Sequence, residues 1–86
     1  MSEQRIEDRL KRLIASRLFL KLAPEAIDET KSLIDVYGVD SVSLLELVVG
    51  LEEEFGIAIP DEEFNLKHFE TVAALASFVR NKLTAG

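Results

Sequence analysis

The sequence has no cysteine and no tryptophan, one histidine, and only two prolines and four glycines in 86 residues. Without cysteine there can be no disulfide framework and no thiolate metal site, so any thiol chemistry requires an added group. No uninterrupted apolar run is long enough to cross a membrane, and Arg and Lys are spread through residues 1–20. We therefore expect neither a signal peptide nor a membrane span, and a cytoplasmic protein.

The chain is short and its charge is uneven. A length of 86 residues predicts one small domain, spanning residues 1–86, with no room for a deep enzyme cleft. Residues 1–33 hold seven bases and six acids, whereas residues 34–86 hold three bases and ten acids. The net charge of −6 therefore resides in the second part, which makes nucleic acid an improbable partner and basic protein surfaces the natural one.

Apolar residues recur at helical spacing in three long segments. The first helix is predicted from residue 6 to near Pro24, the second over residues 42–55, and the last from a cap at Thr71, with the apolar stripe Val72, Leu75, Ala76, Val79 and Leu83. Gly56 and Pro60 are expected to stop the second helix. We expect a short third helix around residues 61–69. The prediction is an all-α fold, a small four-helix bundle of three longer helices and one short one.

Residues 23–39 form the longest connection in this scheme. Their periodicity is weak, and a connection of this length is uncommon unless it packs or has a function. We expect apolar side chains to pin it to the bundle, namely those of Ile27, Leu33, Ile34 and Tyr37. The phenylalanines at 19, 64, 69 and 78 are interpreted as core residues.

One serine lies where this connection passes into the second helix. Gly38 can adopt backbone angles that are closed to other residues, and Asp40 is a strong candidate for the helix N-cap. Ser41 would then be exposed at a helix N-terminus. Outward-pointing amides and the summed peptide dipoles favour negative charge there, so a phosphate ester on Ser41 is physically sensible.

The second helix carries two apolar stripes. One contains Leu44, Leu47, Val48, Leu51 and Phe55, and is assigned to the core. The other contains Val42, Leu45 and Val49, and is flanked by Glu46, Glu52 and Glu53. An apolar strip edged with acids is typical of a partner-docking surface, because burial supplies adhesion while charge orients the partner. The alternative is that the connection or the third helix partly covers these side chains, and that the glutamates simply solvate the surface.

Glu52, Glu53 and Glu54 lie near the end of this helix, where the dipole opposes each exposed acid by roughly 0.3–1 kcal/mol. No base three or four residues away on the same helix offsets them. Charges placed against local stability more often serve binding. Gly50, in the middle of the helix, costs about 1 kcal/mol against alanine and is interpreted as allowing a neighbour to approach closely.

The ordered pattern GVDSV at 38–42, LVVGLEEEF at 47–55 and IPDEE at 59–63 resembles the acyl carrier protein family from about residue 33 to residue 83. The resemblance implies that Ser41 accepts 4'-phosphopantetheine from coenzyme A, through a separate phosphopantetheinyl transferase that uses magnesium. The thiol of that group would carry acyl chains as thioesters, and the protein itself would catalyse nothing.

The resemblance also implies partners. The docking residues that it assigns are Val42, Leu45, Glu46, Val49, Glu52 and Glu53. They would meet acyl-activating, condensing or acyl-transferring enzymes that bear basic patches, and the carrier would be a monomer. Fatty-acid carriers often have an acid where this chain has Ser43, and commonly have Leu where it has Val42. These departures favour polyketide, hybrid or specialised lipid biosynthesis.

Other interpretations stay open or are set aside. A peptidyl or aminoacyl carrier, including a D-alanyl carrier, is the alternative within the class, although Asp40 and the acidity favour an acyl cargo. A small helical interaction module without a prosthetic group is the alternative from another class. Ser41 as a catalytic nucleophile would need an adjacent base, and His68 is the only histidine. No metal site is expected, because the acids at 61–63 lack the spacing of a calcium loop.

Overall fold

The computed structural model describes residues 5–21 and 23–85, and those residues form helices and turns without any strand. The all-α expectation is therefore confirmed. In chain order the elements are α1 (Ile6–Arg17), η1 (Pro24–Ala26), α2 (Leu33–Tyr37), α3 (Ser41–Phe55), η2 (Asp61–Glu63), η3 (Leu66–Phe69) and α4 (Val72–Ala85), where η marks a 3₁₀ turn. None of these helices is long and apolar enough to cross a membrane.

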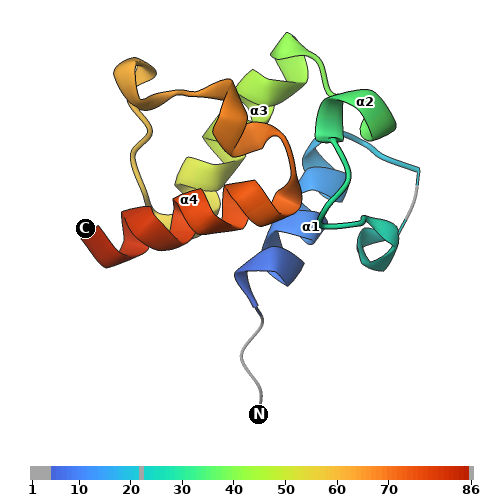
Figure 1. The fold of residues 1–86 in the computed structure, drawn as a ribbon, viewed down its shortest axis with the longest axis horizontal. Helices are drawn as coiled ribbons and strands as arrows, with labels where there is room; N and C mark the ends of the chain where they lie inside the picture. The colour runs from blue at the N-terminus through green and yellow to red at the C-terminus, as the bar shows by residue number, and fades with distance from the viewer. Residues whose placement is uncertain (1–4, 22, 86) are drawn as a thin grey trace.

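The three longer helices enclose the core. α1 packs against both α3 and α4, and α4 crosses the other two in the foreground of Figure 1. Each helix contributes its apolar stripe, and the fully buried side chains include Leu10, Ile14, Leu47, Leu51, Val72, Leu75 and Val79. Each such side chain contributes about 1.5–3 kcal/mol before chain entropy is subtracted. Mutual burial of the stripes therefore holds the bundle together.

Local sequence signals set most helix boundaries where they were expected. The Asp40 carboxylate accepts a hydrogen bond of 2.8 Å from the Ser43 amide and caps α3. Gly56 ends that helix with φ +65° in the left-handed region. The Thr71 hydroxyl accepts a hydrogen bond of 3.0 Å from the Ala74 amide at the start of α4. The predicted caps at both helix starts are confirmed.

Two boundaries differ from the prediction. α1 ends at Arg17 rather than near Pro24, because Phe19 has φ +54° and a left-handed residue cannot continue a right-handed helix. The predicted third helix is also wrong as a single α-helix, since η2 and η3 are separate 3₁₀ turns. The Asn65 side chain accepts a hydrogen bond from the Lys67 amide at 2.9 Å, which favours a local turn over a continuous helix.

The long connection packs closely on the bundle and contains the short α2. Ile27 and Leu33 are buried as predicted, but Ile34 is exposed and does not pin it. Two backbone hydrogen bonds also fasten it to the start of α4. The Leu33 amide donates to the Glu70 carbonyl at 2.8 Å, and the Ala73 amide donates to the Glu29 carbonyl at 3.0 Å.

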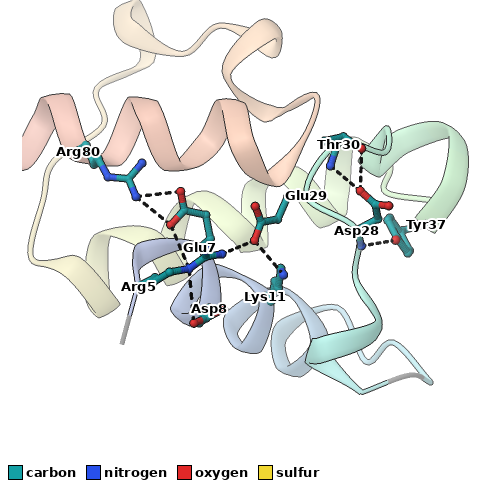
Figure 2. A network of polar contacts seen from close by, with 9 residues as sticks. All are labelled: Arg5, Glu7, Asp8, Lys11, Asp28, Glu29, Thr30, Tyr37 and Arg80. Carbon is teal, nitrogen blue, oxygen red and sulfur yellow. Dashed lines mark hydrogen bonds and ion pairs between the residues drawn. The ribbon is translucent and has the colours of Figure 1, made fainter. Parts of the chain in front are cut away.

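Charged side chains add a second set of links, which Figure 2 shows. Arg5, the N-cap residue of α1, and Lys11 within that helix both contact the Glu29 carboxylate in the connection. Arg80 of α4 donates to both carboxylate oxygens of Glu7, each at 2.8 Å. The first turns of α1 are therefore joined to two segments far away in the sequence.

Not every apolar residue assigned to the core is buried. Phe69 and Phe78 are buried, but Phe19 and Phe64 are exposed, so their assignment as core residues is wrong. Leu83, at the end of the α4 stripe, is exposed as well. His68 lies in η3 and stacks on Phe78 with ring centroids 4.6 Å apart.

Candidate functional site

Ser41 is the first residue of α3 and is exposed. The preceding residue, Asp40, has an extended backbone, while Val39 is buried. Gly38 ends α2 with φ +70°, a conformation that favours glycine, and the Val39 amide donates to the Leu33 carbonyl at 3.2 Å. The serine hydroxyl is thus carried on a fixed turn. Burial of Val39 anchors this turn in the core, Gly38 ends the helix before it, and Asp40 caps the helix after it.

The electrostatics of this turn suit an anion on Ser41. The Ser43 amide hydrogen bond lowers the pKa of the Asp40 carboxyl below its usual value, so Asp40 is ionised at neutral pH and remains a hydrogen-bond acceptor. Its cap satisfies one amide of the first turn, whereas the amides of a helix N-terminus before that position have no partner within the helix. With 15 residues, α3 supplies a full dipole at that end.

The second apolar stripe of α3 is on the surface. Val42 is 73% exposed, Leu45 67% and Val49 46%, whereas Leu44, Leu47, Leu51 and Phe55 are buried and Val48 is half-buried. The division into a core stripe and an outer stripe is therefore confirmed. The connection and the turns at 61–69 therefore do not bury the outer stripe, while the role of the glutamates as a docking border stays a prediction.

The acids beside this stripe have partners that the helix itself does not supply. Arg17 of α1 contacts Glu46 at 3.0 Å and also contacts Glu53. The hydrogen bond to Glu53, and to a smaller extent the one to Glu46, raises the pKa of the Arg17 guanidinium above its usual value. Of the three acids at 52–54 that no base on α3 offsets, Glu53 is therefore offset by a base on the neighbouring helix α1.

The remaining two glutamates of α3 are also engaged. Arg9 of α1 contacts the Glu54 carboxylate at 3.0 Å, and its guanidinium lies over the Phe55 ring, 4.4 Å from the centroid. Glu52 accepts a hydrogen bond of 2.8 Å from the Ile59 amide and so helps to fix the chain that leaves the helix. The four glutamates of α3 therefore form contacts within the molecule and also make its surface acidic.

Gly50 explains how Arg17 reaches two acids that lie two helical turns apart. A Cβ atom at residue 50 would lie 3.2 Å from Arg17 Nε and 3.4 Å from its Cγ. Glu46, Gly50 and Glu53 follow the i, i+4, i+7 spacing of one helix face. The Arg17 side chain thus lies over the glycine with a carboxylate on each side, and the close approach expected at Gly50 is confirmed.

Two open grooves adjoin the exposed stripe. One, of about 590 Å³, lies between the end of α1 and the start of α3 and is lined by residues that include Arg17, Phe19, Val42 and Glu46. The other, of about 240 Å³, is lined by Leu45, Val48, Ile59 and Phe64. Sequence reasoning missed Arg17 and Phe19 as members of this region. The apolar run at 18–20 and the mid-helix glycine were the only available signals.

Comparison with known protein families identifies the family of this chain. A family model described as a phosphopantetheine attachment site matches residues 8–79. The chain belongs to the acyl carrier protein family. The prosthetic group of the family is 4'-phosphopantetheine, and the carrier's residues fit it. An exposed hydroxyl that can be esterified stands at the positive end of a long helix, on a turn that is already formed.

Individual relatives agree with this assignment. The carrier is 45% identical over 58 residues to the acyl carrier protein of Renibacterium salmoninarum, covering 67% of this chain and 69% of that protein. It is 34% identical over 85 residues to the acyl carrier protein of Thermosynechococcus vestitus, covering 99% and 100%. The solution structure of a holo acyl carrier protein from Nitrosomonas europaea matches with a TM-score of 0.81 and 24% identity, covering 94% of this chain and 99% of that one. This last likeness concerns the fold.

Proposed function

We propose that Ser41 is the residue that carries 4'-phosphopantetheine, and that residues 1–86 form a single acyl carrier domain. The supporting observation is the position of this hydroxyl, exposed on the first residue of the 15-residue helix α3. Other serines in the matched region are placed differently. Ser32 uses its hydroxyl to cap α2, Ser43 is half-buried, and Ser16 and Ser77 lie within helices.

The attachment step places one new bond on the protein. The Ser41 oxygen bonds to the phosphorus of the phosphopantetheine moiety of coenzyme A, the bond from that phosphorus to adenosine bisphosphate breaks, and the serine proton is lost. The separate transferase and its magnesium ion supply the catalysis. The terminal thiol of the attached group then carries acyl chains as thioesters, which supplies the chemistry that a chain without cysteine lacks.

The α3 N-terminus favours the product of that step. A phosphodiester keeps one negative charge, and the helix dipole and unpaired amides stabilise an anion at this end. The Asp40 carboxylate already occupies the Ser43 amide and also interacts with the Val42 amide, so the new phosphate would be stabilised mainly by the field of the helix N-terminus. In this scheme Asp40 has a structural role as the cap that orients the serine.

The outer stripe of α3 is the proposed docking face for enzymes. Val42, Leu45 and Val49 supply exposed apolar area next to Ser41, and Glu46, Glu52 and Glu53 supply the acidic border. This combination suits an enzyme surface with an apolar patch edged by Arg or Lys. Transferases and acyl-activating, condensing or acyl-transferring enzymes are the proposed partners.

We further propose an acyl cargo, in polyketide, hybrid or specialised lipid biosynthesis. Ser43 and Val42 support this choice because they depart from the residues common in fatty-acid carriers. An aminoacyl or peptidyl cargo is the competing possibility. Loading assays that offer the phosphopantetheine-bearing protein to acyl-activating and to aminoacyl-activating enzymes, followed by intact-protein mass spectrometry, would separate the two cargoes.

The attachment site is tested with Ser41→Ala and a control two residues away, Ser43→Ala. Each protein is incubated with coenzyme A, magnesium and a broad-specificity phosphopantetheinyl transferase, and its intact mass is measured. We expect wild type and Ser43→Ala to gain one phosphopantetheine and Ser41→Ala to gain none, with unchanged far-UV circular dichroism. Modification of Ser41→Ala would refute the site. Absence of modification in every folded variant would refute the carrier function and favour a helical interaction module.

A further inference from the structure

The C-terminal end of α1 lies against the exposed side of α3, next to the proposed docking face. Phe19 and Val42 line one open groove, together with Arg17 and Glu46. Arg17 contacts two of the acids that border the apolar stripe. The docking face therefore does not consist of α3 alone.

Phe19 has the features of a contact residue. Its side chain is 87% exposed, and its backbone has φ +54°, a left-handed conformation that is costly for a residue other than glycine. The described part of the chain buries most other aromatic rings, so packing does not account for keeping a phenylalanine in this conformation. Aromatic side chains are frequent anchors of protein interfaces. The ring shares a groove with Val42 and so adds apolar surface beside the outer stripe at the start of α3.

Arg17 competes inside the molecule for the charges that a basic partner would use. Its side chain is only partly exposed, but both carboxylates that it contacts are more than half exposed. Ion pairs of this kind are weak in water and exchange readily for equivalent pairs. A partner's arginine or lysine can bind Glu46 or Glu53 fully only when Arg17 releases that carboxylate.

We propose that partner enzymes dock on a composite surface of Phe19, Arg17 and the outer stripe of α3, and that Arg17 must release Glu46 or Glu53 on docking. The partner that fits is a protein surface with an apolar side chain for the groove between Phe19 and Val42 and an arginine or lysine beside it. Charge complementarity supports this choice, because the exposed Glu46 lines the groove and Glu53, the other exposed acid that Arg17 contacts, borders the apolar stripe. The inference depends on the proposed carrier function.

The test compares Arg17→Gln with Arg9→Gln. Both substitutions remove one arginine of α1 that pairs with a glutamate of α3, so they change the net charge equally, but Arg9 contacts Glu54 away from the groove. The readout is KM and kcat for attachment of phosphopantetheine by a broad-specificity transferase, at low and high salt. We expect Arg17→Gln to lower KM about two- to five-fold relative to Arg9→Gln at low salt, because loss of its two weak exposed pairs removes a modest competitor.

Further variants make the measurement specific. In a Glu46→Gln, Glu53→Gln background, Arg17→Gln should no longer lower KM, because the carboxylates for which it competes are gone. Phe19→Gly removes the ring but suits the left-handed backbone, so folding should survive. Phe19→Gly should raise KM about five- to thirty-fold, because the partner loses an aromatic contact. Leu83→Ser, an exposed apolar residue of α4, serves as its control and should leave KM unchanged.

The outcomes separate this inference from the carrier function. Equal KM values for Arg17→Gln and Arg9→Gln, or unchanged KM for Phe19→Gly, would overturn the composite surface while attachment to Ser41 persisted. Absence of attachment in every folded variant would overturn the carrier function and this inference with it. A lowered KM for Arg17→Gln that disappears in the doubly substituted background would support the proposal.

Discussion

Gly50 offers a quantitative test of how α1 and α3 fit together. It lies in the middle of α3, and its backbone angles are not in the left-handed region, so no special conformation requires glycine there. Glycine in a helix interior costs about 1 kcal/mol against alanine. If conformational freedom alone were the reason for glycine at residue 50, Gly50→Ala would act only through the higher helix preference of alanine. If close approach is the reason, the size of the new side chain decides the result.

The crowding can be estimated from the neighbours. A Cβ at residue 50 would lie 3.2 Å from both Leu13 Cδ1 and Arg17 Nε, a few tenths of an ångström inside ordinary contact. Both atoms lie toward the ends of flexible side chains and can shift. We expect crowding to offset most of the helix preference, so Gly50→Ala should change the free energy of unfolding by less than about 0.5 kcal/mol.

Valine adds two more methyl groups at the same place, where the Arg17 stem lies at 3.4 Å. Overpacking of this kind costs about 1–3 kcal/mol, and a β-branched residue recovers little helix preference. Gly50→Val should therefore be less stable than wild type by about 1–3 kcal/mol. Urea unfolding followed by circular dichroism, with m-values compared, measures both variants. A Gly50→Val protein as stable as Gly50→Ala would refute the close-approach reasoning.

Two further predictions concern the bundle. Partial burial opposes ionisation of Glu7, but hydrogen bonds from Arg80 and from the backbone of Glu7 outweigh this effect and lower the Glu7 pKa. The Glu7–Arg80 pair therefore stabilises the fold fully above the unfolded-state pKa of Glu7, and this stabilisation is lost as the pH falls through the lower folded-state pKa. Glu7→Gln should cost about 0.5–1 kcal/mol at pH 7 and progressively less as the pH falls through the folded-state value, by urea titration over that range; a cost that does not change with pH would contradict the pairing. Phe69→Ala should cost about 3–5 kcal/mol, because the ring is fully buried beside Phe64 and Phe78. Leu83→Ser should stay within about 0.5 kcal/mol in the same assay, and a similar loss in both would show that the end of α4 is packed.

The turn that carries Ser41 was predictable because its signals are local. Gly38, Asp40 and Ser41 lie within four residues, and each residue type has a strong preference for its place in a helix-to-helix turn. The apolar stripes of α3 were predictable as well, since the 3.6-residue period fixes which side chains share a face. Asp40 and the exposed Val42 lie where this reasoning placed them.

Contacts between distant segments were not predictable. Arg17 and Glu46 are 29 residues apart, and only the packing of α1 on α3 brings them together. Periodicity identifies an apolar face without stating which neighbouring helix supplies a counter-charge. The predicted end of α1 was wrong for a related reason. The apolar residues at 18–20 continue the helical pattern of the sequence, but the backbone of Phe19 is left-handed and ends the helix. At residues 61–69, the preference of Asn65 for a local turn was overlooked.

The fixed turn beneath Ser41 has a consequence for recognition. Ordering one backbone residue costs roughly 1–2 kcal/mol in entropy, and a modification site in a disordered tail loses that freedom each time an enzyme binds it. Here Val39 is buried, Gly38 closes α2 and Asp40 caps α3, so this loss has already occurred during folding. Under the proposed function, a transferase would therefore meet a prearranged target, and most of the contact energy would remain available for affinity.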